Sequence, residues 1–165
     1  MVSRKNVFRR RREGKTDYRK RLKLIKSGIP RVSVRVTNRE IMIQIIEFSM
    51  SGDLVRASAT SRQLVGLGWG GSTKNIPASY LAGYLAGKRS VKNGVTKAVL
   101  DIGRADAVSG GRIFASLKGL VDGGMKIPHA ESIYPSEERI KGAHISPKIS
   151  GQVDKILKKI EDEAK

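Results

Sequence analysis

Positive charge is concentrated at the start of this chain, and the concentration limits what the first residues can fold into. Residues 1–26 carry twelve of the 33 Lys and Arg residues against only Glu13 and Asp17, which gives them +10 of a formal net charge of +18. Apart from Met1, residues 1–15 hold only three apolar side chains, Val2, Val7 and Phe8. Burying so few cannot offset the entropy of ordering the segment. We therefore expect an arm that is disordered until it meets a partner.

The excess of positive charge indicates a polyanionic partner, because it repels itself in the folded state. Nucleic acid is the first candidate and an anionic membrane surface the second. Four consecutive arginines, Arg9 to Arg12, are a poor choice for a tail that only improves solubility. Arginine-rich segments commonly become ordered on RNA. We therefore interpret the arm as an RNA contact.

Composition excludes several other classes of protein. No run of eighteen apolar residues is present, so we expect no membrane span. Residues 1–12 are basic but lack a following apolar stretch, so we expect no secretory signal, and their arginines are too dense for a mitochondrial presequence. The absence of cysteine excludes disulfides and thiolate metal sites and fits a reducing compartment. The length of 165 residues suggests one domain with extensions.

The pattern after the arm predicts a short helix and then an antiparallel meander. Thr16 is the expected cap of the helix, which carries Tyr18, Leu22 and Ile25 on one stripe and ends at Gly28. Three strands follow at 31–36, 41–48 and 54–60. Alternation puts the valines of the first strand in the core, so Arg31 and Arg35 share the opposite face, which we expect to be open. This face would continue the basic surface of the arm.

The second half of the chain predicts helices around one further strand. A glycine-rich loop at 66–78 leads into a helix that starts at Asn75 or Ile76, and Gly83 with Gly87 would let this helix approach the sheet closely. A buried strand at 97–102, a helix over 113–121 and a last helix from about Ser150 follow. The order β-β-β-α-β-α predicts an α/β (α+β) fold with a mixed sheet, in which a three-stranded antiparallel meander gains a parallel strand. We divide the chain into a basic arm with its helix (1–28), a globular domain (29–127) and a C-terminal extension with a helix (128–165).

Nucleotide and metal motifs fail on spacing. The glycines at 66–71 are spaced G-x-G-x-G-G, which is not a dinucleotide fingerprint, and GYLAGKRS at 83–90 is one residue too short for a phosphate loop. His129 and His144 have no companion ligands. A metal-dependent nuclease is the enzymatic alternative, but Asp101 is a single carboxylate where two cations would need several. We expect no enzymatic activity and no cofactor.

Several long segments resemble one known family. They are RRRREGKTDYRKRLKLIKSGIPR (9–31), VTNREIMIQIIEF (36–48), GWGGSTKNIPASYLAGYLAGK (68–88), AVLDIG (98–103), GGRIFASLKGLVDGGMKIPH (110–129) and EERIKGAHI (137–145). In this order they are similar to the 5S-RNA-binding protein of the large ribosomal subunit, numbered eighteen in bacteria and archaea and five in eukaryotes. The length and the short C-terminal extension resemble archaeal members.

The resemblance implies a structural constituent of the cytoplasmic ribosome whose arm and sheet face lie on 5S rRNA in the central protuberance. Its implied partners are 5S rRNA, large-subunit rRNA and neighbouring large-subunit proteins, including the other 5S-binding protein, and no membrane. Carried over by position, the implied RNA-facing residues are Arg9, Arg10, Arg11, Arg12, Lys15, Tyr18, Arg19, Arg21, Arg31, Arg35, Asn38, Arg39, Ser72, Thr73, Lys74, Asn75 and Arg112. Relatives often carry further basic residues in the loop at 103–110, where this chain has Ala105 to Val108.

Two aromatic residues have alternative interpretations. Tyr18 either stacks on an RNA base or packs in the helix stripe beside Leu22. Trp69 is either a stacking platform or a lid over the core, and we favour the lid. A general nucleic-acid-binding protein is the alternative among binding functions, although the sequence has no helix-turn-helix pattern and no dimerisation zipper.

Overall fold

The computed structural model describes residues 7–164 and contains one mixed four-stranded sheet. The strands are β1 (Arg31–Val36), β2 (Ile41–Glu47), β3 (Leu54–Thr60) and β4 (Val99–Asp101). Their spatial order is β3-β2-β1-β4, with β1 antiparallel to β2, β2 antiparallel to β3, and β4 parallel to β1. The predicted fold class is confirmed.

Alternation of apolar side chains sets one face of the sheet against the core. Val34 of β1 lies opposite Ile43 of β2, which lies opposite Ala59 of β3, and all three side chains are buried. The meander has the predicted strand positions, whereas β4 is shorter than the predicted strand at 97–102. Only three residues of β4 pair with β1, because Lys97 forms a bridge with Lys126 instead.

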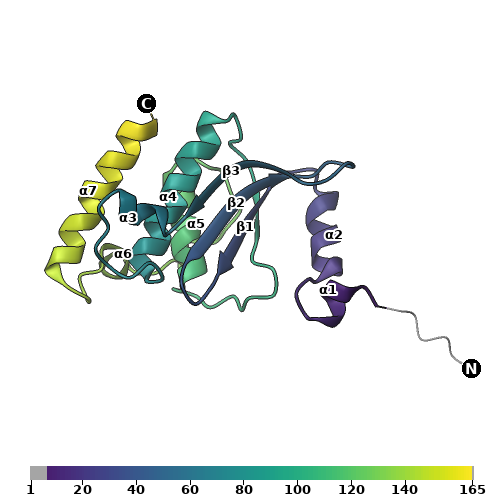
Figure 1. The fold of residues 1–165 in the computed structure, drawn as a ribbon, viewed down its shortest axis with the longest axis horizontal. Coiled ribbons are helices and arrows are strands. Elements are labelled where there is room, and N and C mark those ends of the chain that lie inside the picture. The colour runs from purple at the N-terminus through teal and green to yellow at the C-terminus, as the bar shows by residue number, and fades with distance from the viewer. Residues whose placement is uncertain (1–6, 165) are drawn as a thin grey trace, which may run out of the picture.

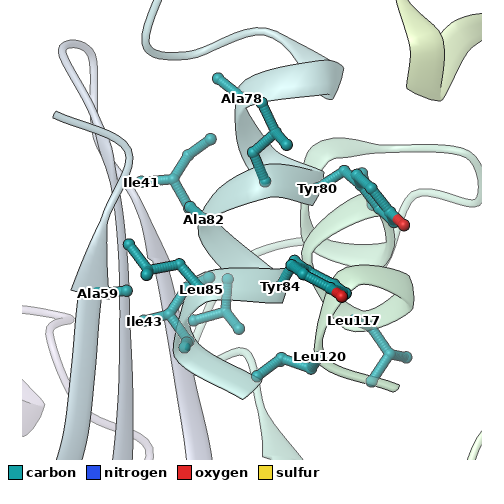
Figure 2. Packing of buried hydrophobic residues seen from close by; sticks show 14 of the residues in the cluster. Ile41, Ile43, Ala59, Ala78, Tyr80, Ala82, Tyr84, Leu85, Leu117 and Leu120 are labelled. Carbon is teal, nitrogen blue, oxygen red and sulfur yellow. The ribbon is translucent and has the colours of Figure 1, made fainter. Parts of the chain in front are cut away.

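Helices lie on both sides of the sheet. Figure 1 shows α4 and α5 against one face and α1 and α2 beyond the other. The helices and their bounds are α1 (Arg9–Arg12), α2 (Tyr18–Lys26), α3 (Gln63–Gly66), α4 (Ile76–Lys92), α5 (Arg112–Asp122), the 3₁₀ turn η1 (Glu131–Ile133), α6 (Glu137–Lys141) and α7 (Pro147–Ala164). Figure 2 shows Ala82 and Leu85 of α4 directed at the sheet, whereas Tyr80 and Tyr84 point away from it.

The glycines of α4 contact a helix rather than the sheet, so the prediction for Gly83 and Gly87 is wrong. A Cβ atom at Gly83 would lie 2.1 Å from the backbone oxygen of Ser116 in α5, and one at Gly87 would lie 2.9 Å from that of Leu120. Gly119 of α5 approaches α4 equally closely. The side of α4 that faces the sheet instead carries Ala82 and Leu85. Glycine therefore permits close contact between two helix backbones.

The C-terminal helix belongs to the same hydrophobic core. We expected its start near Ser150, but α7 begins at Pro147, a residue that suits a first helical turn. Val153, Ile156 and Ile160 are buried in the core cluster. Polar contacts add to this packing: the Tyr84 hydroxyl donates to Glu161 at 2.8 Å, and the Lys159 ammonium donates to the Leu67 carbonyl at 2.7 Å.

The N-terminal arm contains more local structure than we expected. Arg9–Arg12 form one helical turn, with all four side chains exposed. The cap of α2 is Asp17 rather than the predicted Thr16, because the Asp17 carboxylate accepts hydrogen bonds from the backbone N–H groups of Arg19 and Lys20. Arg4 and Lys5 of the predicted arm lie outside the described residues. No helix within 7–164 is long and apolar enough to cross a bilayer.

Candidate nucleic-acid interface

The arm presents its arginines to solvent. Arg9, Arg11 and Arg12 are exposed on α1, and Arg10 beside them donates from Nε to the Thr16 hydroxyl at 3.0 Å. Lys15 lies 2.9 Å from the carboxylate of Glu13, and both are exposed. An exposed pair of this kind contributes little to stability. The arginines of the arm are therefore available to a polyanion.

Helix α2 divides its basic side chains between two directions. Arg19 is exposed, whereas Arg21 turns toward the β2–β3 connection and contacts Asp53 at 2.5 Å. The pKa of the Asp17 cap is lowered, chiefly because the backbone N–H of Lys20 donates to its carboxylate. The cap is therefore ionised near neutral pH and favours the N-terminal turn of α2.

Arg31 and Arg35 share one face of the sheet as predicted, but Arg31 does not lie on an open surface. Its side chain is 8% exposed and pairs with the carboxylate of Asp53, and its Nη1 atom lies 3.7 Å from Asp101. The prediction that this part of the face is open is wrong, because strand alternation gives the direction of a side chain and not what covers it. Here Asp53 of the β2–β3 turn and Asp101 of β4 supply the counter-charges of Arg31.

Arg35 lies at the accessible end of the same ionic group. Its side chain is 41% exposed. It donates from Nη1 to the backbone oxygen of Asp101 at 2.7 Å and from Nη2 to the carboxylate at 3.2 Å. The Asp101 carboxylate, which is 10% exposed, also accepts the N–H of Gly103 at 2.8 Å. Arg35 is therefore fixed in position and still reachable by a ligand.

A cleft of about 520 Å³ separates the arm and α2 from the sheet. Its lining places seven cationic side chains against three carboxylates, so its potential is positive. Two of these cations, Lys20 and Lys23, were not among the predicted site residues. The charged lining residues are Arg10, Lys15, Lys20, Arg21, Lys23, Arg31 and Arg35 with Asp17, Asp53 and Asp101.

A second group of predicted residues meets on the glycine-rich loop. The Thr73 hydroxyl donates to the backbone oxygen of Arg39 at 2.6 Å, which joins this loop to the β1–β2 turn that also holds Asn38. Arg112 of α5 reaches the Lys74 carbonyl at 3.5 Å. We call residues 38, 39, 72–75 and 112 the loop surface. Arg39, Lys74 and Arg112 are exposed there.

Some polar groups of the loop surface have structural roles. The Asn75 side chain caps α4 by accepting the N–H of Ala78 at 2.9 Å. The Ser72 carbonyl accepts the indole N–H of Trp69 at 3.1 Å. Trp69 is 3% exposed and belongs to the core cluster, which confirms its interpretation as a lid.

The ring of Tyr18 is half-buried and packs against Phe8 of the arm, with ring centroids 5.4 Å apart. Stacking of Tyr18 on a base stays a prediction. Sequence reasoning missed Arg104, which lines a hollow of about 240 Å³ with Arg11, Arg19 and Tyr18. Arg104 could have been found from the expected parallel pairing of β4 with β1, since this pairing brings the loop after β4 to the arm.

The carboxylates of the described residues do not form a metal-ligand set. Within 7–164, no three His, Asp or Glu side chains gather closely enough to hold a metal ion. Asp101, the candidate for a nuclease, directs its oxygens at Arg31 and Arg35. Its charge is thus compensated by guanidinium groups.

Comparison with known proteins places the chain in a family. Residues 3–96 and 91–130 match the family model described as "Ribosomal large subunit proteins 60S L5, and 50S L18". Each of the following relatives bears the name "Large ribosomal subunit protein uL18". The relative from Methanothermobacter thermautotrophicus is 52% identical over 141 residues, which cover 86% of this chain and 73% of the relative. The relative from Korarchaeum cryptofilum is 55% identical over 139 residues, covering 84% and 71%, and that from Methanoculleus marisnigri is 51% identical over 139 residues, covering 84% and 79%. The chain therefore belongs to the uL18 family of large-subunit ribosomal proteins and resembles its archaeal members.

Proposed function

We propose that this protein, a structural constituent of the large ribosomal subunit and not an enzyme, binds 5S rRNA and anchors it in the central protuberance. Family membership supports the ribosomal role, and with it a place on the ribosome in the cytoplasm. The observation that carries the finer proposal is the cationic cleft between the α1–α2 arm and the sheet.

The chemistry of the cleft fits an RNA backbone. Lys and Arg side chains neutralise phosphates and release counterions, and the arginine guanidinium can donate two hydrogen bonds to one phosphate. The cleft lies between the exposed arm on one side and Arg35 on the other, so a bound strand would meet cations along both walls. RNA of this kind is recognised by shape, 2′-hydroxyls and unstacked loop bases rather than through its narrow major groove.

The loop surface supplies a second contact area with a defined geometry. The hydrogen bond from Thr73 to Arg39 ties the glycine-rich loop to the β1–β2 turn, so Arg39 and Lys74 are held on one surface. We propose that this surface contacts 5S rRNA or adjacent large-subunit rRNA. Neighbouring large-subunit proteins, including the other 5S-binding protein, complete the proposed set of partners.

A salt series on the full-length chain tests the proposal. Replacing Arg9, Arg10, Arg11 and Arg12 with Gln should weaken 5S rRNA binding and flatten the slope of log affinity against log salt by about 0.7–0.9 for each phosphate that the variant no longer neutralises. The control replaces Lys155 and Lys158 of α7 with Ala, because both lysines are exposed and belong to neither proposed surface. Filter binding would measure the affinity of both variants for 5S rRNA and for an unrelated structured RNA of similar length. Equal affinity for the two RNAs would contradict 5S recognition.

A further inference from the structure

The turn between β2 and β3 carries an exposed apolar surface. We call residues 47–55 the hairpin tip. Met50 is 94% exposed and Phe48 is 48% exposed, and Leu54 and Val55 beside them are about as exposed as Phe48. Isolated exposed apolar residues are normal on a protein surface, but here four occur within eight positions of the sequence. Leu54 and Val55 are consecutive in β3 and point to opposite faces, so Met50 and Phe48 are the side chains of the tip best placed for a protein contact.

The hairpin tip is held in a fixed conformation. The Gly52 N–H donates to the Ser49 carbonyl at 3.1 Å, which closes a turn with Met50 at its apex. Glu47 pairs with Arg56 across the two strands at 2.5 Å. Asp53 pairs with Arg21 of α2 and with Arg31 of β1. Because these contacts order the turn before any partner arrives, the turn would lose little conformational entropy on binding.

Charge argues against RNA as the occupant of this surface. One residue in five of the chain is Lys or Arg, yet none occurs between Arg39 and Arg56. The flanking cations Arg56, Arg21 and Arg31 are paired with carboxylates of the hairpin tip. The hairpin tip itself therefore offers a phosphate backbone two carboxylates, Glu47 and Asp53, and no cation of its own. A second copy of this chain is also disfavoured, since two molecules of net charge +18 repel each other.

The outer edge of β3 restricts how a partner can bind. Arg89 donates from Nη1 to the Ser58 carbonyl at 2.9 Å, and the Asn93 amide donates to the Arg56 carbonyl at 2.6 Å. Two carbonyls of this edge strand are thus occupied, one by a side chain of α4 and one by that of Asn93 at its C-terminal cap. A partner strand cannot extend the sheet there without displacing them. Contact must instead be made through the side chains of the hairpin tip.

We propose that the hairpin tip inserts Met50 and Phe48 into an apolar cleft of another protein of the large subunit. The unbranched Met side chain adapts to an irregular cleft, and Phe48 adds a rigid aromatic anchor. This contact goes beyond RNA binding and rests on the large-subunit role alone.

A competition experiment measures the contact in assembled subunits. Cells would express a tagged variant beside the untagged wild-type chain, and the ratio of the two would be measured in purified large subunits. Met50→Glu should lower the tagged share about ten-fold or more relative to a Val65→Glu control. The reason is that a carboxylate at position 50 cannot enter an apolar cleft favourably, so the interface loses the contribution of its Met50 anchor. Val65 is also exposed, lies outside the hairpin tip and receives the same charge change. Equal shares for the two variants would overturn the proposal.

The nature of the occupant is determined by photo-crosslinking in the same subunits. A photoreactive phenylalanine analogue at position 50 should give one discrete adduct with a different protein, which protease removes and Phe48→Glu abolishes. An adduct removed by ribonuclease, or a dimer of this chain, would overturn the proposal in favour of RNA or a second copy. Filter binding separates this result from 5S recognition, since Met50→Glu and Val65→Glu should have the same 5S rRNA affinity. A selective loss of RNA affinity in Met50→Glu would also count against a protein occupant.

Discussion

Arg35 donates hydrogen bonds to both the backbone oxygen and the carboxylate of Asp101, at 2.7 and 3.2 Å. The same carboxylate lies 3.7 Å from Arg31, which also pairs with Asp53, and Asp53 accepts a hydrogen bond from Arg21. Two carboxylates thus link three arginines from α2 and β1. This group links α2 to β1 through Asp53 and lines the proposed RNA cleft.

Arg31→Ala should destabilise the fold more than Arg35→Ala. Removal of Arg31 leaves the buried Asp101 carboxylate undercompensated, which should cost about 3 kcal/mol, the low end for a broken buried pair because Asp101 keeps Arg35. Arg35 is partly exposed, so its removal should cost about 1 kcal/mol. Urea denaturation of both variants measures the difference. Equal free energies of unfolding would mean that Arg31 is solvated.

Arg39→Ala and Arg35→Ala should differ in the salt dependence of RNA binding. Arg39 is exposed, and no carboxylate of the described residues pairs with it, so its removal should flatten the slope of log affinity against log salt by about 0.7–0.9. The removal of Arg35 should flatten it less, because Asp101 already compensates part of its charge. Filter binding between low and moderate salt would measure both slopes. An equal or larger change for Arg35 would mean that Asp101 does not reduce the charge that Arg35 offers to a phosphate.

The sheet could be predicted from the sequence because its signal is local. Valines alternating in 31–36 and the turn at 37–40 fix strand positions without knowledge of any distant residue. The partner of α4 could not be predicted in this way. Glycines at 83 and 87 indicate that some backbone comes close, but the sequence pattern does not say that it is α5 rather than the sheet.

The candidate site shows the same division between local and non-local information. The exposed arginines of α1 follow from local composition, since the four residues of this helix include no apolar side chain to bury. The burial of Arg31 depends on Asp53, 22 positions away, and the hollow at Arg104 depends on the parallel pairing of β4 with β1. Neither the burial of Arg31 nor the hollow at Arg104 can be inferred from the neighbouring residues in the sequence.

Asp17→Ala should weaken the first turn of α2, and the effect should depend on pH. The pKa of Asp17 is lowered by the N–H of Lys20, so the cap is present above the unfolded pKa of about 3.9 and is lost as pH falls through the folded value. In a pH titration by NMR, the amide signals of Arg19 and Lys20 should shift together with a midpoint below about 3.9. Asp17→Asn should keep the helix and abolish the shift. A midpoint at or above the ordinary value would contradict the cap.

Gly83→Ala and Gly151→Ala should have opposite effects on stability. A Cβ at Gly83 would lie 2.1 Å from the Ser116 backbone oxygen, so α4 and α5 must separate, at a cost of about 3 kcal/mol or more. Gly151 lies inside α7 with nothing within 4 Å of the added carbon, so alanine should stabilise the helix by about 0.5–1 kcal/mol. Thermal unfolding compares the two variants. A harmless Gly83→Ala would show that the helices pack less closely.

Ionisation of Tyr84 at alkaline pH should weaken the docking of α7 on α4. Its pKa is raised to about 12, first because burial disfavours the phenolate and then because its hydroxyl donates to Glu161. Since the folded state holds the proton more tightly, the contribution of Tyr84 to stability is complete below its ordinary pKa of about 10 and is lost as pH rises through about 12. Tyr84→Phe should cost about 0.5–1.5 kcal/mol at pH 7, because it removes one hydrogen bond.

The phenolate absorbance of the folded protein provides the readout, since it follows tyrosine ionisation directly. Wild type should show an ionisation step near pH 12 that Tyr84→Phe reduces. Glu161→Gln is the matched variant: it keeps a hydrogen-bond acceptor but removes the negative charge, so it should lower the pKa of Tyr84 while leaving α7 docked. If Glu161→Gln leaves the step unchanged, the charge of Glu161 does not raise this pKa and the contact between α4 and α7 carries no charge-dependent coupling.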